Sequence, residues 1–256
     1  MDILTSKKNG VLTIEFNRPK KKNSITSAMY QMMADALQDG QSDADVRVIM
    51  FCGKQDIFTA GNDLDDFMNA SARGDLANLP VAQFMLQLSS AAKPVIAAVA
   101  GAAIGIGTTM LLHCDLVYAA DNAKFSMPFA KLGLCPEFGS SMLLPQIVGY
   151  QRAVEKLFFG ESFSAQEACS MGLVAKVLPP DELMPFANTQ AAKLVALPAS
   201  SLRTTKNLIK SAQTETIMAR MMEESKFFGA MLLAPEAKEA FIAFFEKRKP
   251  DFTKFS

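Results

Sequence analysis

The sequence predicts an α/β fold in which strands alternate with helices through the first half and helices follow through the second. Short apolar runs at Val46–Cys52 and Pro94–Val99 fit buried strands. Helical spacing of apolar residues at Ser24–Gln38 and Pro80–Ser90 precedes each of them, and this alternation favours parallel crossover units. From about Ser140 onward the pattern indicates helices only.

The chain opens with a predicted β-hairpin. Extended runs at Ile3–Lys7 and Val11–Phe16 flank Asn9-Gly10, a dipeptide that favours a tight turn. Because the second run ends at Asn17-Arg18-Pro19, the strand is expected to stop there.

The other elements are placed by their caps and spacing. Ser24 or Thr26 can cap the first helix, and Gly40 is expected to end it. Two more strands are predicted at Leu116–Ala120 and Lys124–Ser126. The later helices are expected at 153–159, 165–171, 181–196, 200–212, 214–232 and 235–247.

Length and composition are typical of one folded unit with a helical extension. The chain has 256 residues, of which 50% are apolar, so a large core can form. The change of pattern predicts a core at 1–195 and a helical region at 196–256. Lys and Arg balance Asp and Glu at 26 each, so no net field attracts nucleic acid or a membrane surface. Glycines interrupt the richest apolar run, Pro94–Met110, so no membrane span is expected.

Cysteine and histidine usage disfavours metal and triad chemistry. The four cysteines lie far apart without a C-x-x-C pair, which suggests free thiols in a reducing compartment. The only histidine, His113, follows a mainly apolar run and is expected to pack rather than act as a base.

Two loops are candidates for anion binding. Residues 58–64 and 101–107 each follow a buried strand and precede a helical pattern, so their N–H groups can point outward at a helix start. Ordinary strand-to-helix turns would look the same. The second loop is not a dinucleotide fingerprint, because G-x-G-x-x-G would require glycine at Met110.

A third loop, 134–141, contains one acid in apolar surroundings. Glu137 is flanked by Pro136 and Phe138, with Leu134 and Met142 close in sequence. Burial would raise the pKa of its carboxyl towards that of a useful general base. Glu137 is therefore the candidate catalytic residue.

Together the motifs resemble the crotonase (enoyl-CoA hydratase/isomerase) superfamily, from about Thr13 to Phe252. The matching motifs are Asn17-Arg18-Pro19 with Asn23, Ala60-Gly61-x-Asp63-Leu64, Gly101 with Gly105-x-Gly107, Cys114-Asp115, Ser164–Ala168 with Gly172-Leu173-Val174, and Phe245–Pro250. The resemblance implies a crotonase-like spiral of β-β-α turns, followed by C-terminal helices that make a homotrimer or a dimer of trimers.

The resemblance also implies roles for the loops. The N–H groups of Asn62 and Ile106 would hold the thioester oxygen of an acyl-CoA as an enolate. Coenzyme A, which is part of the substrate, would contact six loop residues; these are Ala60, Gly61, Asn62, Asp63, Leu64 and Gly105. No metal and no redox cofactor are expected.

The positions of carboxylates predict the reaction. Hydratases of this family carry two glutamates where this sequence has Thr109 and Phe129. Glu137, within Pro136–Ser141, instead resembles the base of the peroxisomal-type Δ3,Δ2-enoyl-CoA isomerases. One base suffices for an isomerase, because the proton removed from C2 can be returned at C4.

Two alternatives remain open. The first is hydration, or a ring-opening or other isomerisation of an unusual acyl-CoA, because the shape of the acyl pocket cannot be read from sequence. The pocket is expected to be formed by residues 70–87 and 142–147, with Met68, Met85 and Met142 in its wall. The second is a non-catalytic acyl-CoA or RNA-binding relative. Against RNA binding, the region Lys193–Lys210 carries few cations and fits a solvated face.

The C-terminal helix is expected to cover the site. Phe241, Phe244 and Phe245 share one face, and the basic end would bring Lys249, and secondarily Lys247, to a coenzyme A phosphate. The final residues, 253–256, do not match a peroxisomal address, so a cytoplasmic location is expected.

Overall fold

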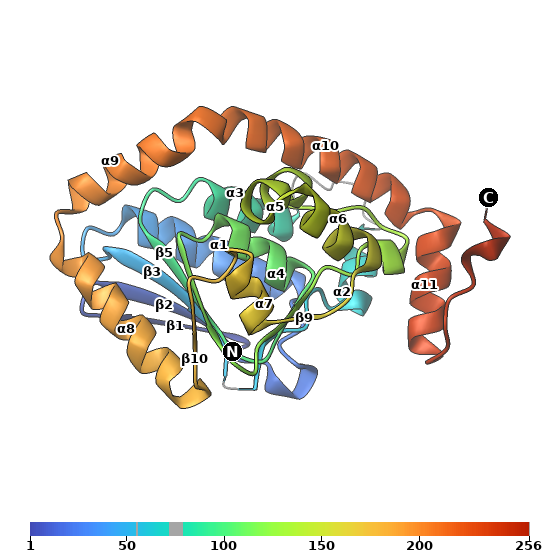
Figure 1. Ribbon diagram of the computed structural model, residues 1–256, viewed down its shortest axis with the longest axis horizontal. Coiled ribbons are helices and arrows are strands. Elements are labelled where there is room, and N and C mark those ends of the chain that lie inside the picture. The colour runs from blue at the N-terminus through green and yellow to red at the C-terminus, as the bar shows by residue number, and fades with distance from the viewer. Residues whose placement is uncertain (55, 72–78, 256) are drawn as a thin grey trace.

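Six strands form the main sheet of the computed structural model, which describes residues 1–54, 56–71 and 79–255 (Figure 1). Their order is β1-β2-β3-β5-β7-β10, with β1 antiparallel to β2 and the other neighbours parallel. The strands are β1 (Ile3–Lys8), β2 (Val11–Phe16), β3 (Val48–Cys52), β5 (Val95–Val99), β7 (Leu116–Ala120) and β10 (Lys176–Leu178).

A second, smaller sheet lies at the carboxyl ends of these strands. It has the order β4-β6-β8-β9 and consists of β4 (Ile57–Thr59), β6 (Ala102–Ile104), β8 (Lys124–Ser126) and β9 (Phe163–Ser164). Because β3, β5 and β7 are each followed by a strand of the small sheet, the chain repeats one β-β step three times. The predicted spiral of β-β-α turns is therefore confirmed.

Helices cover both faces of the main sheet and continue beyond it. They are α1 (Ser27–Ser42), α2 (Leu64–Ser71), α3 (Pro80–Ser89), α4 (Ile106–Thr109), α5 (Ser140–Val148), α6 (Tyr150–Phe159), α7 (Ala165–Ser170), α8 (Pro180–Ala196), α9 (Ala199–Lys210), α10 (Thr214–Leu232) and α11 (Pro235–Phe245). In Figure 1, α9 and α10 form a long arch over the other elements, and α11 lies at its far end. No helix among the described residues is long and apolar enough to cross a membrane.

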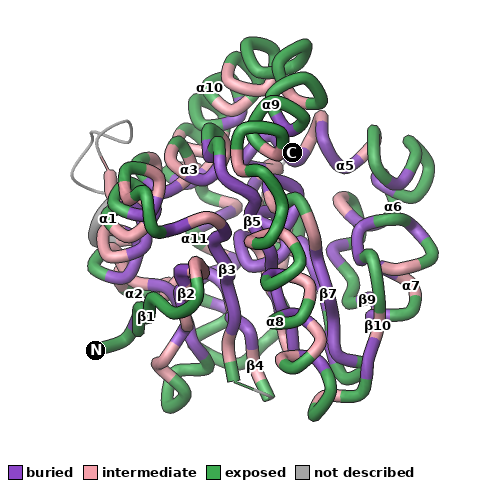
Figure 2. Tube along the Cα trace, turned by 90° about the vertical axis from the view of Figure 1, so that its left-hand side faces the viewer, coloured by how far each residue is buried: buried purple, intermediate pink, exposed green. Residues whose placement is uncertain are grey.

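The core forms on both faces of the main sheet because side chains alternate along each strand. On β3, Ile49 and Phe51 join the larger core cluster, whereas Val48 and Met50 face α8 in the smaller one. Figure 2 shows these central strands buried along most of their length. A parallel sheet covered on both faces explains why its strands read as continuous apolar runs in the sequence.

Long-range polar contacts fix the arch to the sheet. Lys206 of α9 is buried and donates from Nζ to the carbonyl oxygen of Lys93 at 2.8 Å and to Asp115 Oδ2 at 2.6 Å. Asp115 Oδ2 also accepts from the N–H of Val95, the first residue of β5, at 2.8 Å. The start of the arch is therefore bonded to the strand that leads into the second candidate loop.

The structure corrects three details of the predicted elements. Gly40 lies inside α1 rather than ending it, because a Cβ there would come within 2.5 Å of Leu12 Cδ2 and glycine permits this close packing. The region after Ser140 is not helical throughout, since β9 and β10 complete the two sheets. Both strands are only two or three residues long, too short for a periodicity to emerge. Helix α5 had not been predicted, and Pro145 lies within it.

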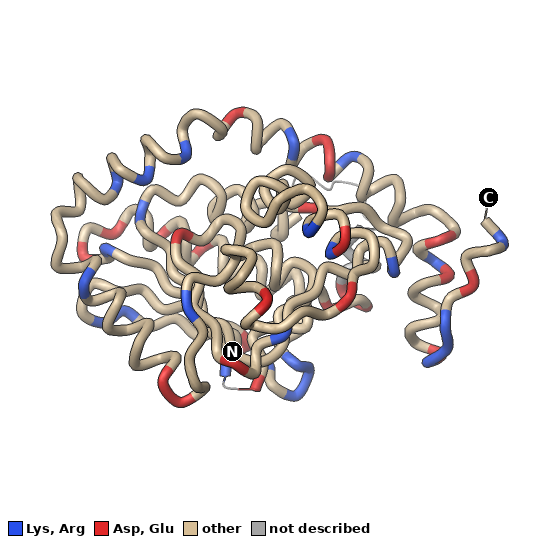
Figure 3. The backbone as a smooth tube through the Cα atoms, in the orientation of Figure 1, with Lys and Arg blue, Asp and Glu red and all other residues tan. Residues whose placement is uncertain are grey.

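Other predicted elements are confirmed within a few residues. The hairpin forms with Ile3 opposite Phe16, and Thr26 caps α1 by accepting from the N–H of Met29 at 3.3 Å. Figure 3 shows acidic and basic residues interspersed along the chain, as the balanced composition suggested. The division into 1–195 and 196–256 stays a prediction, although α8 ends and α9 begins close to that boundary.

Candidate active site

Two loops meet at the edge of the small sheet. Strands β4 and β6 are parallel neighbours, so the loops that follow them leave from the same edge. The backbones touch there, because a Cβ added to Gly61 would lie 2.7 Å from the carbonyl oxygen of Ile104. Gly61 also has φ +85°, a conformation that only glycine adopts without strain. The sequence thus brings the start of α2 and the start of α4 side by side.

Each loop presents one free backbone donor to the same cavity. Within the described part of the chain, the N–H groups of Asn62 and Ile106 donate to no protein acceptor. Their neighbours are paired: the N–H of Asp63 donates to the carbonyl of Ile25 at 2.9 Å, and the N–H of Gly105 to that of Ser126 at 2.8 Å. Two free donors on adjoining loops are suited to bind one oxygen that gains negative charge.

Side chains hold the first loop in place. Arg18 Nη1 donates to Asp63 Oδ2 at 2.7 Å, and Ser24 Oγ donates to the same oxygen at 3.1 Å. Partial burial alone would raise the pKa of Asp63, but these donors lower it below its usual value. Tyr30, buried in α1, donates from its hydroxyl to Asn62 Oδ1 at 2.5 Å. Hydrogen bonds to Asn62 and to its neighbour Asp63 therefore hold this part of the loop.

The loops open into a cavity of about 600 Å³. Its wall includes every loop residue that the sequence predicted, namely Ala60, Gly61, Asn62, Asp63, Leu64, Gly105 and Ile106, together with Glu137. Aromatic side chains of the arch and of α11 close another side, namely Phe228, Phe241, Phe244 and Phe245. Lys21, Lys22 and Lys131 add positive charge to the lining.

Glu137 is a buried carboxyl with one satisfied oxygen. It is 8% exposed, and Thr109 Oγ1 donates to its Oε1 at 2.5 Å. Its Oε2 is buried and has no hydrogen-bond partner among the described residues. Burial raises the pKa of Glu137 to about 8; the Thr109 hydrogen bond opposes this rise, and the nearby Glu224 carboxylate adds to it. A carboxyl with such a pKa can take up or release a proton near neutral pH.

Comparisons with known proteins decide the family. A family model described as Enoyl-CoA hydratase/isomerase matches residues 6–254. The chain belongs to this family. It is 37% identical over 252 residues to Enoyl-CoA delta isomerase 2 of Rattus norvegicus, covering 97% of this chain but only 64% of the rat protein. It is 34% identical over 257 residues to 1,2-epoxyphenylacetyl-CoA isomerase of Escherichia coli (strain K12), covering 98% of each chain.

The fold of this chain matches that of a solved structure from the same family. The crystal structure of an enoyl-CoA hydratase/isomerase from Pseudoalteromonas atlantica T6c matches with a TM-score of 0.94 and 38% identity. The match covers 99% of this chain and 100% of that one. The crotonase resemblance, first inferred from short motifs, is therefore confirmed over the whole chain.

A smaller cavity of about 80 Å³ adjoins the main one in this family member. The two share Asn62, Glu137 and Phe228, and the rest of the smaller lining is mostly apolar, namely Leu79, Val81, Ala82, Met85, Phe138, Met221, Ser225 and Leu232. Of the segments expected to shape an acyl pocket, residues 79–85 contribute, and 72–78 lie outside the described residues. Met68 and Met142 are not in the lining, whereas α10 supplies four residues that the sequence did not indicate.

His113 packs as predicted. Its Nε2 donates to the carbonyl of Phe138 at 2.7 Å, and the two rings stack with centroids 4.0 Å apart. Burial lowers the pKa of His113 to about 4, so the ring is neutral at physiological pH. All four cysteines are free thiols. No group of three potential metal ligands occurs within the described ranges.

The predicted phosphate-binding lysines are not among the cavity residues of one chain. Lys247 and Lys249 are exposed beyond the end of α11, so their role stays a prediction. The lysines that do line the cavity are Lys21, Lys22 and Lys131. The first two belong to a run of three lysines at 20–22, and this cluster of positive charge could have indicated a phosphate-binding site in the sequence. Lys131 is isolated, and only the fold brings it to the cavity.

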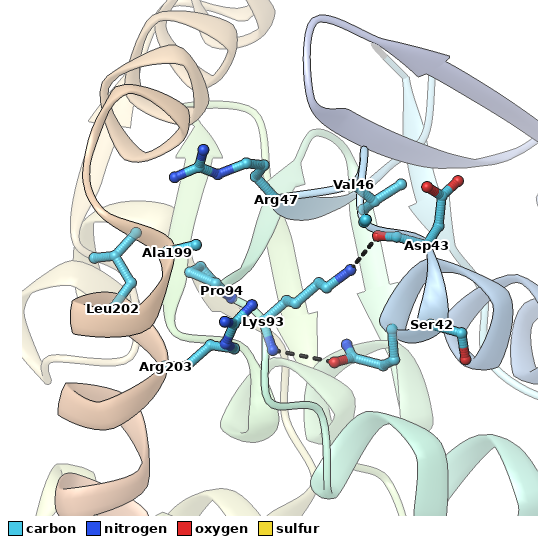
Figure 4. Close-up of a pocket in the computed structure, with 11 residues that line it drawn as sticks. Ser42, Asp43, Val46, Arg47, Lys93, Pro94, Ala199, Leu202 and Arg203 are labelled. Carbon is cyan, nitrogen blue, oxygen red and sulfur yellow. Dashed lines mark hydrogen bonds between the residues drawn. The ribbon is translucent and has the colours of Figure 1, made fainter.

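A third cavity, of about 170 Å³, lies away from Glu137 between the end of α1, the segments that precede β3 and β5, and α9 (Figure 4). Lys93 is its buried cation. Its Nζ donates to the carbonyl oxygens of Gly40 at 2.7 Å and Asp43 at 2.6 Å, near the end of α1. These contacts satisfy carbonyls at a helix terminus, so we assign Lys93 to the packing of α1 rather than to the active site.

The raised pKa of Glu137 predicts a pH-dependent stability. Between the ordinary value of 4.5 and about 8, the folded protein retains a proton that the unfolded chain releases. Stability from this group is therefore present below 4.5 and falls as pH rises towards 8, by at most about 1.4 kcal/mol per pH unit. Glu137→Gln removes this dependence. As pH rises from 5 to 8, the free energy of unfolding of the variant should therefore increase relative to that of the parent.

Denaturant unfolding at several pH values measures this difference. Glu161→Gln, at an exposed position, is the matched control and should follow the parent at every pH. If Glu137→Gln also runs parallel to the parent, the carboxyl is not buried as described.

Proposed function

We propose that this family member moves the C3=C4 double bond of an enoyl-CoA to C2=C3. The observation that carries the proposal is the arrangement of carboxylates around the large cavity. Among the described lining residues, Glu137 is the only acid that is buried and has no ion pair, whereas Asp63 is paired with Arg18 and Asp65 is exposed. A single base near two free amide donors is what this proton transfer requires.

The proposed reaction begins with the thioester oxygen between the N–H groups of Asn62 and Ile106. These donors stabilise the negative charge that develops when the C2 proton leaves, by a few kcal/mol each. Glu137 takes that proton, and the C2–H electron pair forms the dienolate. Protonated Glu137 then gives the proton to C4, and the electrons of the C3=C4 bond form the new C4–H bond. The C1=C2 electrons of the dienolate form the C2=C3 bond, and an electron pair of the oxygen restores the thioester carbonyl. No metal or redox group takes part in these steps.

The positions of Thr109 and Phe129 disfavour hydration. Addition of water needs a second carboxyl to activate or protonate it, and the family's hydratases carry glutamates at these two positions. Here Thr109 donates to Glu137, and Phe129 is a buried ring in the cavity wall. Glu137 therefore has no carboxyl partner at either position.

A second candidate is isomerisation of a cyclic or epoxidised acyl-CoA. It is supported by the similarity to 1,2-epoxyphenylacetyl-CoA isomerase, which extends over 98% of both chains. The same base and amide donors would serve, and the difference would arise in the acyl pocket.

RNA binding receives less support from the structure. Of the cations at 193–210, Lys206 is buried against Asp115, and Lys210 donates to the carbonyl of His113 at 3.0 Å. Only Lys193 and Arg203 remain to form a basic surface. Such a pair is too small for strong phosphate-driven binding.

Coenzyme A would place its phosphates near the lysines and its pantetheine arm along the first loop. Lys21, Lys22 and Lys131 can approach the phosphates within one chain. We propose that Lys249, and secondarily Lys247, act from a neighbouring subunit of a trimer. Exposed apolar side chains on α9 and α10, including Leu208, Ile209 and Phe227, would be covered in that assembly.

Substitution of the base tests the proposed reaction. Glu137→Gln should lower kcat for a 3-enoyl-CoA by about a thousandfold, because general-base catalysis contributes roughly 10²–10⁴-fold. Conversion of 3-hexenoyl-CoA to 2-hexenoyl-CoA provides the assay, with Glu161→Gln as control. Turnover of Glu137→Gln within a few-fold of the parent would disprove the base assignment. Preferential hydration of crotonyl-CoA by the parent protein would instead disprove the isomerase assignment.

Two lysine variants test coenzyme A recognition. Lys22→Ala and Lys249→Ala should each raise KM several-fold and leave kcat unchanged, because an exposed cation contributes little beyond binding. A pantetheine thioester lacks the nucleotide phosphates, so with this substrate both variants should match the parent. Lys8→Ala, exposed on β1, is the control. A lowered kcat with unchanged KM would show that the substituted lysine does not bind a phosphate.

A further inference from the structure

The turn that follows Glu137 has an uncommon backbone. Phe138 has φ 60° and Gly139 has φ 71°, so two consecutive residues lie in the left-handed region. For phenylalanine this conformation is strained and needs support from surrounding contacts. Since Glu137 immediately precedes the turn, the direction of its carboxyl depends on whatever holds these residues.

Glu224 of α10 supports the turn from outside its own segment. It is 5% exposed, and its Oε2 accepts from the N–H of Gly139 at 2.5 Å. Its Oε1 accepts from the N–H of Ser141 at 2.9 Å and from the Ser141 hydroxyl at 2.5 Å. The carboxylate thus binds the first free N–H groups of α5, where a negative charge is favoured. On the other side, His113 donates to the carbonyl of Phe138 at 2.7 Å.

The contacts of Glu224 are not needed to close the turn itself. Glu137 and Ser140 already form a local turn, because the Ser140 N–H and hydroxyl both donate to the Glu137 carbonyl, at 3.1 and 2.6 Å. Glu224 adds a bond from 85 residues away and fixes the turn to the arch that passes over α5 (Figure 1).

Few other charges reach this region. Tyr30 from α1 and Cys135 from the preceding loop interact electrostatically with Glu137, and both are neutral at physiological pH because burial raises the pKa of each. Arg220 of α10 acts on Glu224, but its guanidinium is paired with Glu223 at 2.8 Å. His113 is neutral. Glu224 is the acid whose charge raises the pKa of Glu137. Burial raises the pKa of Glu224 itself, and its hydrogen bonds from Ser141 and Gly139 oppose that rise.

We propose that Glu224 is a positioning residue for Glu137: it clamps the Gly139–Ser141 backbone, which directs the Glu137 carboxyl into the cavity, and it holds a second carboxylate beside this turn. The inference rests on the proposed function for the role of Glu137 as base. The clamp and the charge can be separated, because Glu224→Gln keeps the length and removes the charge, whereas Glu224→Asp keeps the charge and shortens the side chain.

The test combines kinetics with a direct titration of Glu137. The carboxyl groups are labelled with ¹³C-glutamate, and Glu137→Gln identifies the Glu137 resonance by its loss. The midpoint of the Glu137 titration should be highest in the parent, lower in Glu224→Asp and lowest in Glu224→Gln. The shorter aspartate moves the neighbouring charge away, and glutamine removes it. Isomerase kcat should fall about tenfold or more in both variants, since each breaks part of the clamp, with KM changed less than about threefold. The acid limb of the pH profile should move to lower pH with the titration midpoint.

Glu215→Gln is the matched control, because Glu215 is also an acid of α10 but is exposed. It should leave the titration and kcat unchanged. If Glu224→Gln does not fold, as judged by circular dichroism, Glu224→Asp alone carries the test. If kcat falls while the Glu137 midpoint is unchanged, Glu224 acts through the backbone clamp and its charge plays no part. If kcat and the midpoint are both unchanged in the folded variants, the proposal is overturned, because Glu224 then serves the fold only. If the parent does not isomerise 3-enoyl-CoA, the proposed function fails, but the titration still decides whether Glu224 acts on Glu137.

Discussion

The burial of one carboxyl group is the constraint around which the active site is arranged. Glu137 has little contact with solvent and a single hydrogen bond to Oε1, so its charged form lacks most of the stabilisation that water would give. This loss makes the carboxylate basic, and it must be offset by favourable packing elsewhere. The apolar neighbours that cause it, including Leu134, Phe138 and Phe228, also form the walls that an acyl chain would contact. The same surfaces therefore set the pKa of the base and enclose the proposed substrate.

The two sheets supply the other half of the site. Parallel pairing of β4 with β6 places two strand ends at one edge, and the loops that leave them each expose one N–H group. Backbone donors of this kind need no particular side chain, so Asn62 and Ile106 can differ in chemistry and still share the proposed role. Rigidity comes from contacts behind the loops, such as Arg18 with Asp63 and the close approach of Gly61 to Ile104. The fold thus fixes the donors before any ligand arrives.

Local patterns predicted much of this arrangement. The hairpin, the central strands, both loops and the isolated Glu137 could be read from short stretches, because periodicity, turn residues and flanking apolar residues are properties of neighbours in sequence. Residues that reach the site from distant parts of the sequence could not be predicted in this way. Glu224, Met221 and Phe228 reach the site only because α10 passes over it, and in the sequence they belong to an ordinary amphipathic helix. β10 is similar, since three residues become a strand only through pairing with β7.

In the proposed reaction, one buried carboxyl carries a proton between two carbons of the substrate. The most direct measurement follows a 3-enoyl-CoA that carries deuterium at C2 through a few per cent of its conversion in ordinary water. Because Glu137 is shielded from solvent, we expect a substantial fraction of the product to contain deuterium at C4. Product that forms with only solvent hydrogen at C4, even at the lowest conversion, would contradict transfer by a single shielded base.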